Sequence, residues 1–133
     1  MTTQKRFSDT HHWSHLTSAA QQEVEAVLAA LPQEVRERLT ELPITFEPKP
    51  NSAMVASGID VNRTLGLFTG VSFARAIEVS QRLPPQVILF LDNIYVYVRG
   101  DVPEFRTQLR RTLLHEIGHY LGLDEDEVDM RGL

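Results

Sequence analysis

His115, Glu116 and His119 form an HExxH motif, in which two histidines four residues apart flank a glutamate. On a helix, the two imidazoles lie about 40° apart around the axis, so both can reach one metal ion. The glutamate points a further step round the helix, where it can hold a metal-bound water instead of the metal. An accidental HExxH in a chain of this length has a probability on the order of one in a few hundred. The motif therefore predicts a metal site, against the alternative of ordinary surface or core histidines.

A hydrolytic zinc site takes three protein ligands and keeps one position for water. The chain has no cysteine, so all three ligands must be histidines or carboxylates. Glu125 stands ten positions after His115, at the ligand position that ends the extended pattern HExxHxxGxx. A continuous helix would carry it about 12 Å beyond the histidine pair, but Gly122 can reverse the chain. Asp124 and Asp126 flank Glu125 and are alternatives if the turn differs by one residue.

Glu116 is the predicted catalytic residue. Zinc lowers the pKa of its bound water, and Glu116 accepts the proton as that water attacks a carbonyl and then returns it to the departing amine. The alternative for Glu116 is an exposed helix carboxylate paired with a lysine or arginine. The acidic run 124–129 has its own alternative as a solvated helix N-terminus, with a final turn from about Glu125 to Arg131. Tyr120 stays open between an oxyanion donor and a core residue.

The run from Arg111 to Asp126 resembles the small bacterial zincin-like metallopeptidase family, the minimal zincins. The resemblance covers roughly residues 22–133 and is supported by the segments 31–39, 65–71 and 85–90. It implies an α+β, minimal zincin-like fold, with a small mixed β-sheet packed against helices and HExxH on a long C-terminal helix. It also implies one zinc ion held by His115, His119 and an acidic residue after the glycine, commonly aspartate at the position of Glu125.

The leading functional hypothesis is a zinc-dependent metallopeptidase that acts on a peptide or protein substrate. The alternative is a non-catalytic metal-binding interaction module that retains the zincin site. The net charge of −5 disfavours nucleic-acid binding, for which a basic stripe is expected. The polar start of the chain predicts no signal peptide, and residues 87–98 form an apolar stretch too short to span a bilayer. Together with the lack of disulfides, these features predict a cytoplasmic protein without a membrane partner.

Residues 1–16 are predicted to form a flexible tail, followed by a single zincin-like domain over residues 17–133. The tail contains His11, His12 and His15, for which an exposed cluster without a metal is favoured over a second metal site. A capping box at Ser18 and Gln21 predicts the start of the first helix. Pro32 predicts an early position of a second helix, which runs to about residue 39 or 40.

The middle of the chain carries the strand signals. Residues 44–46 predict a short strand, and residues 48–63 predict an irregular loop because they are rich in Pro, Asn, Ser and Gly. The apolar run 65–70 has two glycines and predicts a strand or turn whose backbone passes close to another element. Residues 76–79 are a candidate strand. Residues 87–91 are apolar throughout and predict a central strand covered by helices, whereas 94–98 fit a short helix or more strand.

The last predicted helix has the clearest ends. Asp101 is its expected N-cap with Pro103 in the first turn, and Gly122 fits the left-handed position after Leu121. An apolar stripe places the histidines beside the buried face of this helix; it consists of Phe105, Leu109, Leu113, Ile117 and Leu121. Gly118 has low helix propensity, which predicts close packing at that position.

Overall fold

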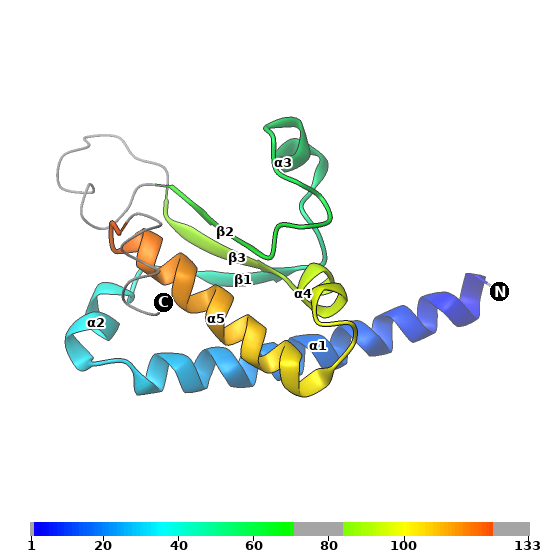
Figure 1. Ribbon diagram of the computed structural model, residues 1–133, viewed down its shortest axis with the longest axis horizontal. Helices are drawn as coiled ribbons and strands as arrows, with labels where there is room; N and C mark the ends of the chain where they lie inside the picture. The colour runs from blue at the N-terminus through cyan, green and yellow to red at the C-terminus, as the bar shows by residue number, and fades with distance from the viewer. Residues whose placement is uncertain (1, 71–83, 124–133) are drawn as a thin grey trace.

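The protein has a mixed α+β fold with a small sheet and several helices (Figure 1). The computed structural model describes residues 2–70 and 84–123, with side chains from Thr10 onward. The predicted strand at 76–79 and residues 124–133 lie outside these ranges. In chain order, the described elements are α1 (Thr2–Ala30), α2 (Gln33–Arg38), β1 (Ile44–Glu47), α3 (Ser52–Ala56), β2 (Gly66–Thr69), β3 (Gln86–Phe90), α4 (Leu91–Tyr97) and α5 (Val102–Tyr120).

The described sheet is mixed, with the strand order β1-β3-β2. β1 pairs with β3 in parallel, and β2 pairs with β3 antiparallel. β3 is therefore the central strand, as its sequence predicts, and its residues Val87–Phe90 are all buried. β2 has β3 on one side only among the described strands, so its other edge is open there.

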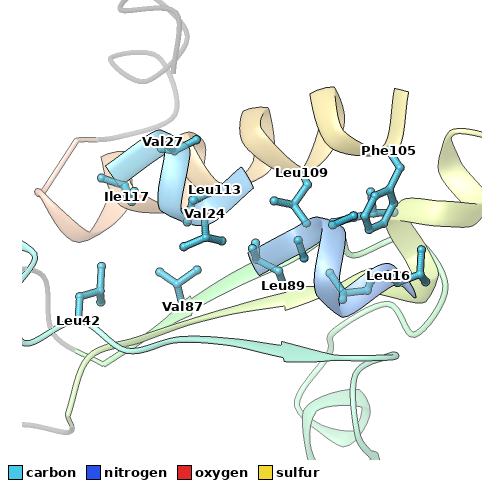
Figure 2. Packing of buried hydrophobic residues seen from close by; sticks show 14 of the residues in the cluster. Leu16, Val24, Val27, Leu42, Val87, Leu89, Phe105, Leu109, Leu113 and Ile117 are labelled. Atoms are coloured by element: carbon cyan, nitrogen blue, oxygen red, sulfur yellow. The ribbon is translucent and has the colours of Figure 1, made fainter. Parts of the chain in front are cut away.

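The hydrophobic core lies between one face of the sheet and the two long helices α1 and α5 (Figure 2). Val87 and Leu89 point from β3 toward these helices because alternate residues of a strand face the same side. From α5 the predicted stripe supplies Phe105, Leu109, Leu113 and Ile117, and all four are buried. The remaining member, Leu121, is partly buried against the same cluster. The spacing of these apolar residues therefore determines which face of α5 is buried and which face remains for the HExxH residues.

α1 differs from the sequence prediction, because it already begins at Thr2. Residues 10–16 continue it as regular helix, and the predicted capping box at Ser18 lies inside it. The reason is a stripe of apolar residues that begins earlier than expected: Trp13 is partly buried and Leu16 is buried, in step with Ala20 and Val24. None of the helices within 2–70 and 84–123 combines the length and apolar character needed to cross a bilayer.

Two further segments acquire helix that local propensity does not predict. The predicted irregular loop 48–63 contains α3, whose N-cap Asn51 accepts a hydrogen bond from the Met54 amide at 2.9 Å. Of the two alternatives for residues 94–98, the structure has helix up to Tyr97, although β-branched and aromatic residues favour strand locally. Ile94 is buried in the core, so tertiary packing decides the conformation of α4.

Candidate metal centre

α5 carries the three residues of the HExxH motif in its last two turns. The ring centres of His115 and His119 lie 4.8 Å apart with the ring planes at 85°. Two imidazoles that bind one zinc ion through bonds of about 2.0–2.1 Å at a tetrahedral angle place their ring centres roughly 5 Å apart. The observed pair therefore has the separation that shared coordination of one ion requires.

The end of α5 fixes which nitrogen of His119 can bind a metal. The carbonyl oxygen of Leu123 lies 3.2 Å from His119 Nδ1. A carbonyl only accepts hydrogen bonds, so Nδ1 carries the proton in this contact and the lone pair of a neutral ring is on Nε2. Metal-binding histidines commonly have such a carbonyl partner, which orients the ring and raises its basicity. The donor chemistry of the pair therefore fits zinc.

A Schellman motif produces this contact. The amide of Leu123 donates to the carbonyl of Gly118 at 3.0 Å, and the amide of Gly122 donates to the carbonyl of His119 at 2.9 Å. Gly122 has φ +95°, the left-handed conformation that its sequence position predicts. The chain therefore turns back at Gly122 and passes the imidazole of His119.

The candidate third ligands Asp124, Glu125 and Asp126 lie outside the described residues. Within 2–70 and 84–123, no group of three histidines or carboxylates is placed to hold one metal ion. The two histidines therefore have no third ligand from that part of the chain. Asp124 follows Leu123 directly in the sequence, and Leu123 is the residue whose carbonyl contacts the His119 ring.

The N-terminal histidines lie on α1, far from the motif in sequence. His11 Nε2 and His15 Nε2 are 3.0 Å apart, one helical turn from each other, and both side chains are exposed. His12 points elsewhere and makes an edge contact with the ring of Tyr95, with ring centres 4.5 Å apart. The structure thus separates the three histidines into a pair and a single residue, and they form no three-ligand cluster.

Glu116 lies directly beneath β2. A Cβ atom added to Gly66 would be 3.3 Å from Glu116 Cγ and 2.7 Å from Thr112 Cγ2. The backbone of β2 therefore approaches α5 as closely as a glycine allows, which confirms the close approach that the two glycines in residues 65–70 predict. Two residues further along the strand, Phe68 packs against Tyr120, with ring centres 5.8 Å apart. Tyr120 is 5% exposed and acts as a core residue in this contact.

We expect Gly66→Ala to lower the free energy of unfolding by about 1–3 kcal/mol, the usual cost of overpacking a filled interior. The added methyl would overlap Thr112 Cγ2, and a β-branched side chain in a helix has little rotamer freedom to move away. Urea titration followed by circular dichroism measures the change.

Thr112→Ser supplies the control, because it removes the overlapping methyl and keeps the hydroxyl that accepts from Gln108 Nε2 at 3.2 Å. Alone it removes one buried methyl, which costs about 0.5–1.5 kcal/mol. Because residues 66 and 112 are in contact, the effects of the two substitutions on the free energy of unfolding should not be additive. The double variant should be at least as stable as Gly66→Ala, and simple additivity would show that Thr112 is not what Gly66 contacts.

A groove of about 400 Å³ opens between β2 and α5 beside the motif. Its walls are Thr64, Leu65 and Gly66 on one side and Gln108, Arg111, Thr112, His115 and Glu116 on the other. Gln108, Arg111 and Thr112 are not singled out by the sequence analysis. The available signal was their position one to two turns before the motif on the same face of the helix.

Asn93 holds the first wall of this groove in place. It is 1% exposed, and its Nδ2 donates to the carbonyl oxygens of Val61 and Thr64, both at 2.9 Å. Its Oδ1 accepts from Lys49 Nζ at 3.0 Å. A buried amide with three partners fixes the segment that leads into Gly66. In the sequence, Asn93 could have been recognised as a polar residue within the longest apolar stretch.

Asp60 orders the same segment from its exposed side. Its Oδ1 accepts hydrogen bonds from the backbone amides of Asn62 at 2.9 Å and Arg63 at 3.0 Å. These two N–H groups hold the pKa of the Asp60 carboxyl below its usual value because they favour the charged form. The loop before β2 is thus held by Asp60 on its exposed side and by Asn93 on its buried side.

Comparison with protein families connects this site to known proteins. The model of the zincin-like metallopeptidase family matches residues 39–133, which include every element of the sheet, α5 and the HExxH motif. No curated protein matches the chain. Because the match covers most of the sequence and the whole of the candidate site, the chain belongs to the zincin-like metallopeptidase family.

Proposed function

We propose that the protein is a zinc-dependent peptidase, with His115, His119 and Glu125 as zinc ligands and Glu116 as the general base. Membership of the metallopeptidase family supports hydrolysis. The observation that carries the proposal is the position of Glu116, which lines the groove together with His115 and lies under Gly66 at the edge of the sheet.

The edge of β2 that no described strand covers favours a peptide over a small molecule as substrate. The carbonyl of Leu65 accepts from the Phe90 amide at 2.9 Å, so Leu65 faces β3. Hydrogen-bonding directions alternate along an antiparallel strand, and the backbone groups of Gly66 and Phe68 therefore point away from β3. An extended peptide can add to such an edge through main-chain hydrogen bonds. Glu116 lies beside that position.

Each residue of the site has a defined part in the proposed reaction. Zinc, when bound, would supply Lewis acidity and a nucleophilic water at neutral pH. Gly66 and Phe68 hold the peptide backbone along the groove. Glu116 takes a proton from the attacking water and delivers it to the leaving amine. His119 keeps its orientation through the Nδ1 contact with Leu123.

Metal removal tests this proposal on the unmodified protein. We expect about one zinc ion per chain by elemental analysis and cleavage of some members of a peptide library. Dialysis against a chelator should remove both the metal and the cleavage, and added zinc should restore them, because the hydrophobic core does not include the two histidines. A buffer-dialysed sample is the matched control.

The outcomes separate the peptidase from the metal-binding module. Bound zinc without cleavage of any peptide would favour the module, since structural zinc sites have no need of a base. Failure to bind zinc at neutral pH would contradict both functions. Cleavage that survives chelation would show that the reaction does not depend on the metal.

A further inference from the structure

The groove beside Glu116 has a cationic end. Apart from His115 and Glu116, Arg111 is the only ionisable residue among the described residues that line it. Arg111 is exposed and lies on α5 one turn before His115. Its guanidinium therefore faces solvent in the same groove as the motif.

Arg111 differs from the other two arginines of α5. Arg106 and Arg110 approach Glu23 of α1, with N···O distances of 3.4 and 3.8 Å. Arg111 forms no ion pair with any residue of 2–70 or 84–123. Arg106 and Arg110 thus join two helices, whereas Arg111 lines the groove and pairs with no acidic residue in the described parts of the chain.

The neighbouring polar side chain is already engaged. Gln108 Nε2 donates to Thr112 Oγ1 at 3.2 Å across one helical turn. Arg111 is therefore the main donor that this part of the groove offers to an anion. A guanidinium binds a carboxylate through two parallel hydrogen bonds, which gives both strength and direction.

Helix geometry sets where along a substrate this charge acts. Glu116 comes five positions after Arg111, which corresponds to about 7.5 Å along the helix axis. An extended peptide advances about 3.3 Å per residue, so the same distance spans roughly two residues of substrate. A carboxylate at that position would meet Arg111 while the cleaved bond lies at Glu116.

We propose that Arg111 is the specificity residue of this site and selects peptides that carry a carboxylate about two residues from the cleaved bond. This inference rests on the proposed peptidase function. The carboxylate belongs to an aspartate or glutamate side chain, or to the C-terminus of the substrate. These two sources share one chemistry and make different predictions for amidated peptides.

Binding, measured separately from cleavage, tests the inference. The protein is the full chain with Glu116→Gln, which prevents turnover, and with Arg111→Gln, Arg111→Glu or the control Arg110→Gln added. The probes are fluorescein-labelled peptides of alanine and serine that are eight residues long. Each peptide contains a single Glu, Gln or Lys, which is placed at each position in turn. Every peptide is made with a free and with an amidated C-terminus, and fluorescence anisotropy gives the dissociation constant.

With Arg111 intact, the best Glu peptide should bind about fivefold to tenfold more tightly than its Gln counterpart, at or above the upper end of the range of a fully exposed ion pair. Arg111→Gln should abolish this preference, Arg111→Glu should reverse it toward Lys, and Arg110→Gln should leave it unchanged. A Glu preference that survives amidation assigns the carboxylate to a side chain, whereas an equal loss of Glu and Gln binding on amidation, absent in Arg111→Gln, assigns it to the C-terminus of the substrate.

Three results would overturn the inference. They are binding that is weakened neither by Gln in place of Glu nor by amidation, an equal effect of Arg110→Gln and Arg111→Gln, and no binding by any peptide. None of them depends on zinc or cleavage, so failure of the peptidase proposal is recognised separately by the metal and library experiment.

Discussion

Glu116→Gln should lower kcat by about 100-fold to 10,000-fold, the range that a general base contributes, while zinc stoichiometry stays at the wild-type value. Glutamine has nearly the shape of glutamate, so the contact beneath Gly66 is kept. Its amide cannot accept a proton from the attacking water. Steady-state kinetics on a peptide from the library, together with elemental analysis, measures both quantities.

Glu104→Gln is the matched control, because Glu104 lies in the first turn of the same helix and is exposed. It should leave kcat unchanged and cost at most about 1 kcal/mol through its interaction with the helix dipole. Wild-type turnover in Glu116→Gln would remove Glu116 from the mechanism. Loss of zinc in that variant would instead make Glu116 a ligand.

Glu125→Ala should weaken zinc binding at least about 100-fold. Loss of a residue that only orients a ligand costs about 10–100-fold in metal affinity, and loss of a ligand should exceed that. The histidine pair has no third ligand within 2–70 and 84–123, and the chain reaches the His119 ring at Leu123. Competition with a fluorescent zinc chelator measures the affinity.

Asp124→Ala and Asp126→Ala are the controls for position, and each should change the affinity less than about threefold if its carboxylate stays in solvent. A large loss in one of them and none in Glu125→Ala would move the ligand by one residue. Removal of residues 124–133 should abolish tight binding in either case. Wild-type affinity after that removal would place the third ligand elsewhere in the chain.

The parts of the fold that the sequence predicts are those set by short-range chemistry. Asp101 caps α5 by accepting from the Glu104 amide at 3.0 Å, and Gly122 adopts the left-handed conformation, because both roles depend on a few adjacent residues. The same holds for the central strand, whose unbroken apolar run requires cover on both faces. The approach at Gly66 was also predictable, since a glycine within an apolar strand signals a close neighbour.

The features that the sequence does not predict depend on contacts with residues that are distant in the sequence. α1 extends to Thr2 because Trp13 and Leu16 find a core to pack against, which the three polar histidines nearby obscure. The anchoring contacts of Asn93 and the place of Arg111 in the groove arise from the approach of the loop before β2 to α4 and α5. Nothing within a few residues of either position encodes that approach.

The way Asn93 holds the groove has a consequence for how this member of the zincin-like metallopeptidase family can diversify. Its side chain binds the main-chain carbonyls of Val61 and Thr64, not their side chains. These two hydrogen bonds therefore do not depend on which side chains occupy positions 61 and 64. Single substitutions of Thr64 can therefore change the chemistry of this wall of the groove, while Gly66 and α5 keep their spacing.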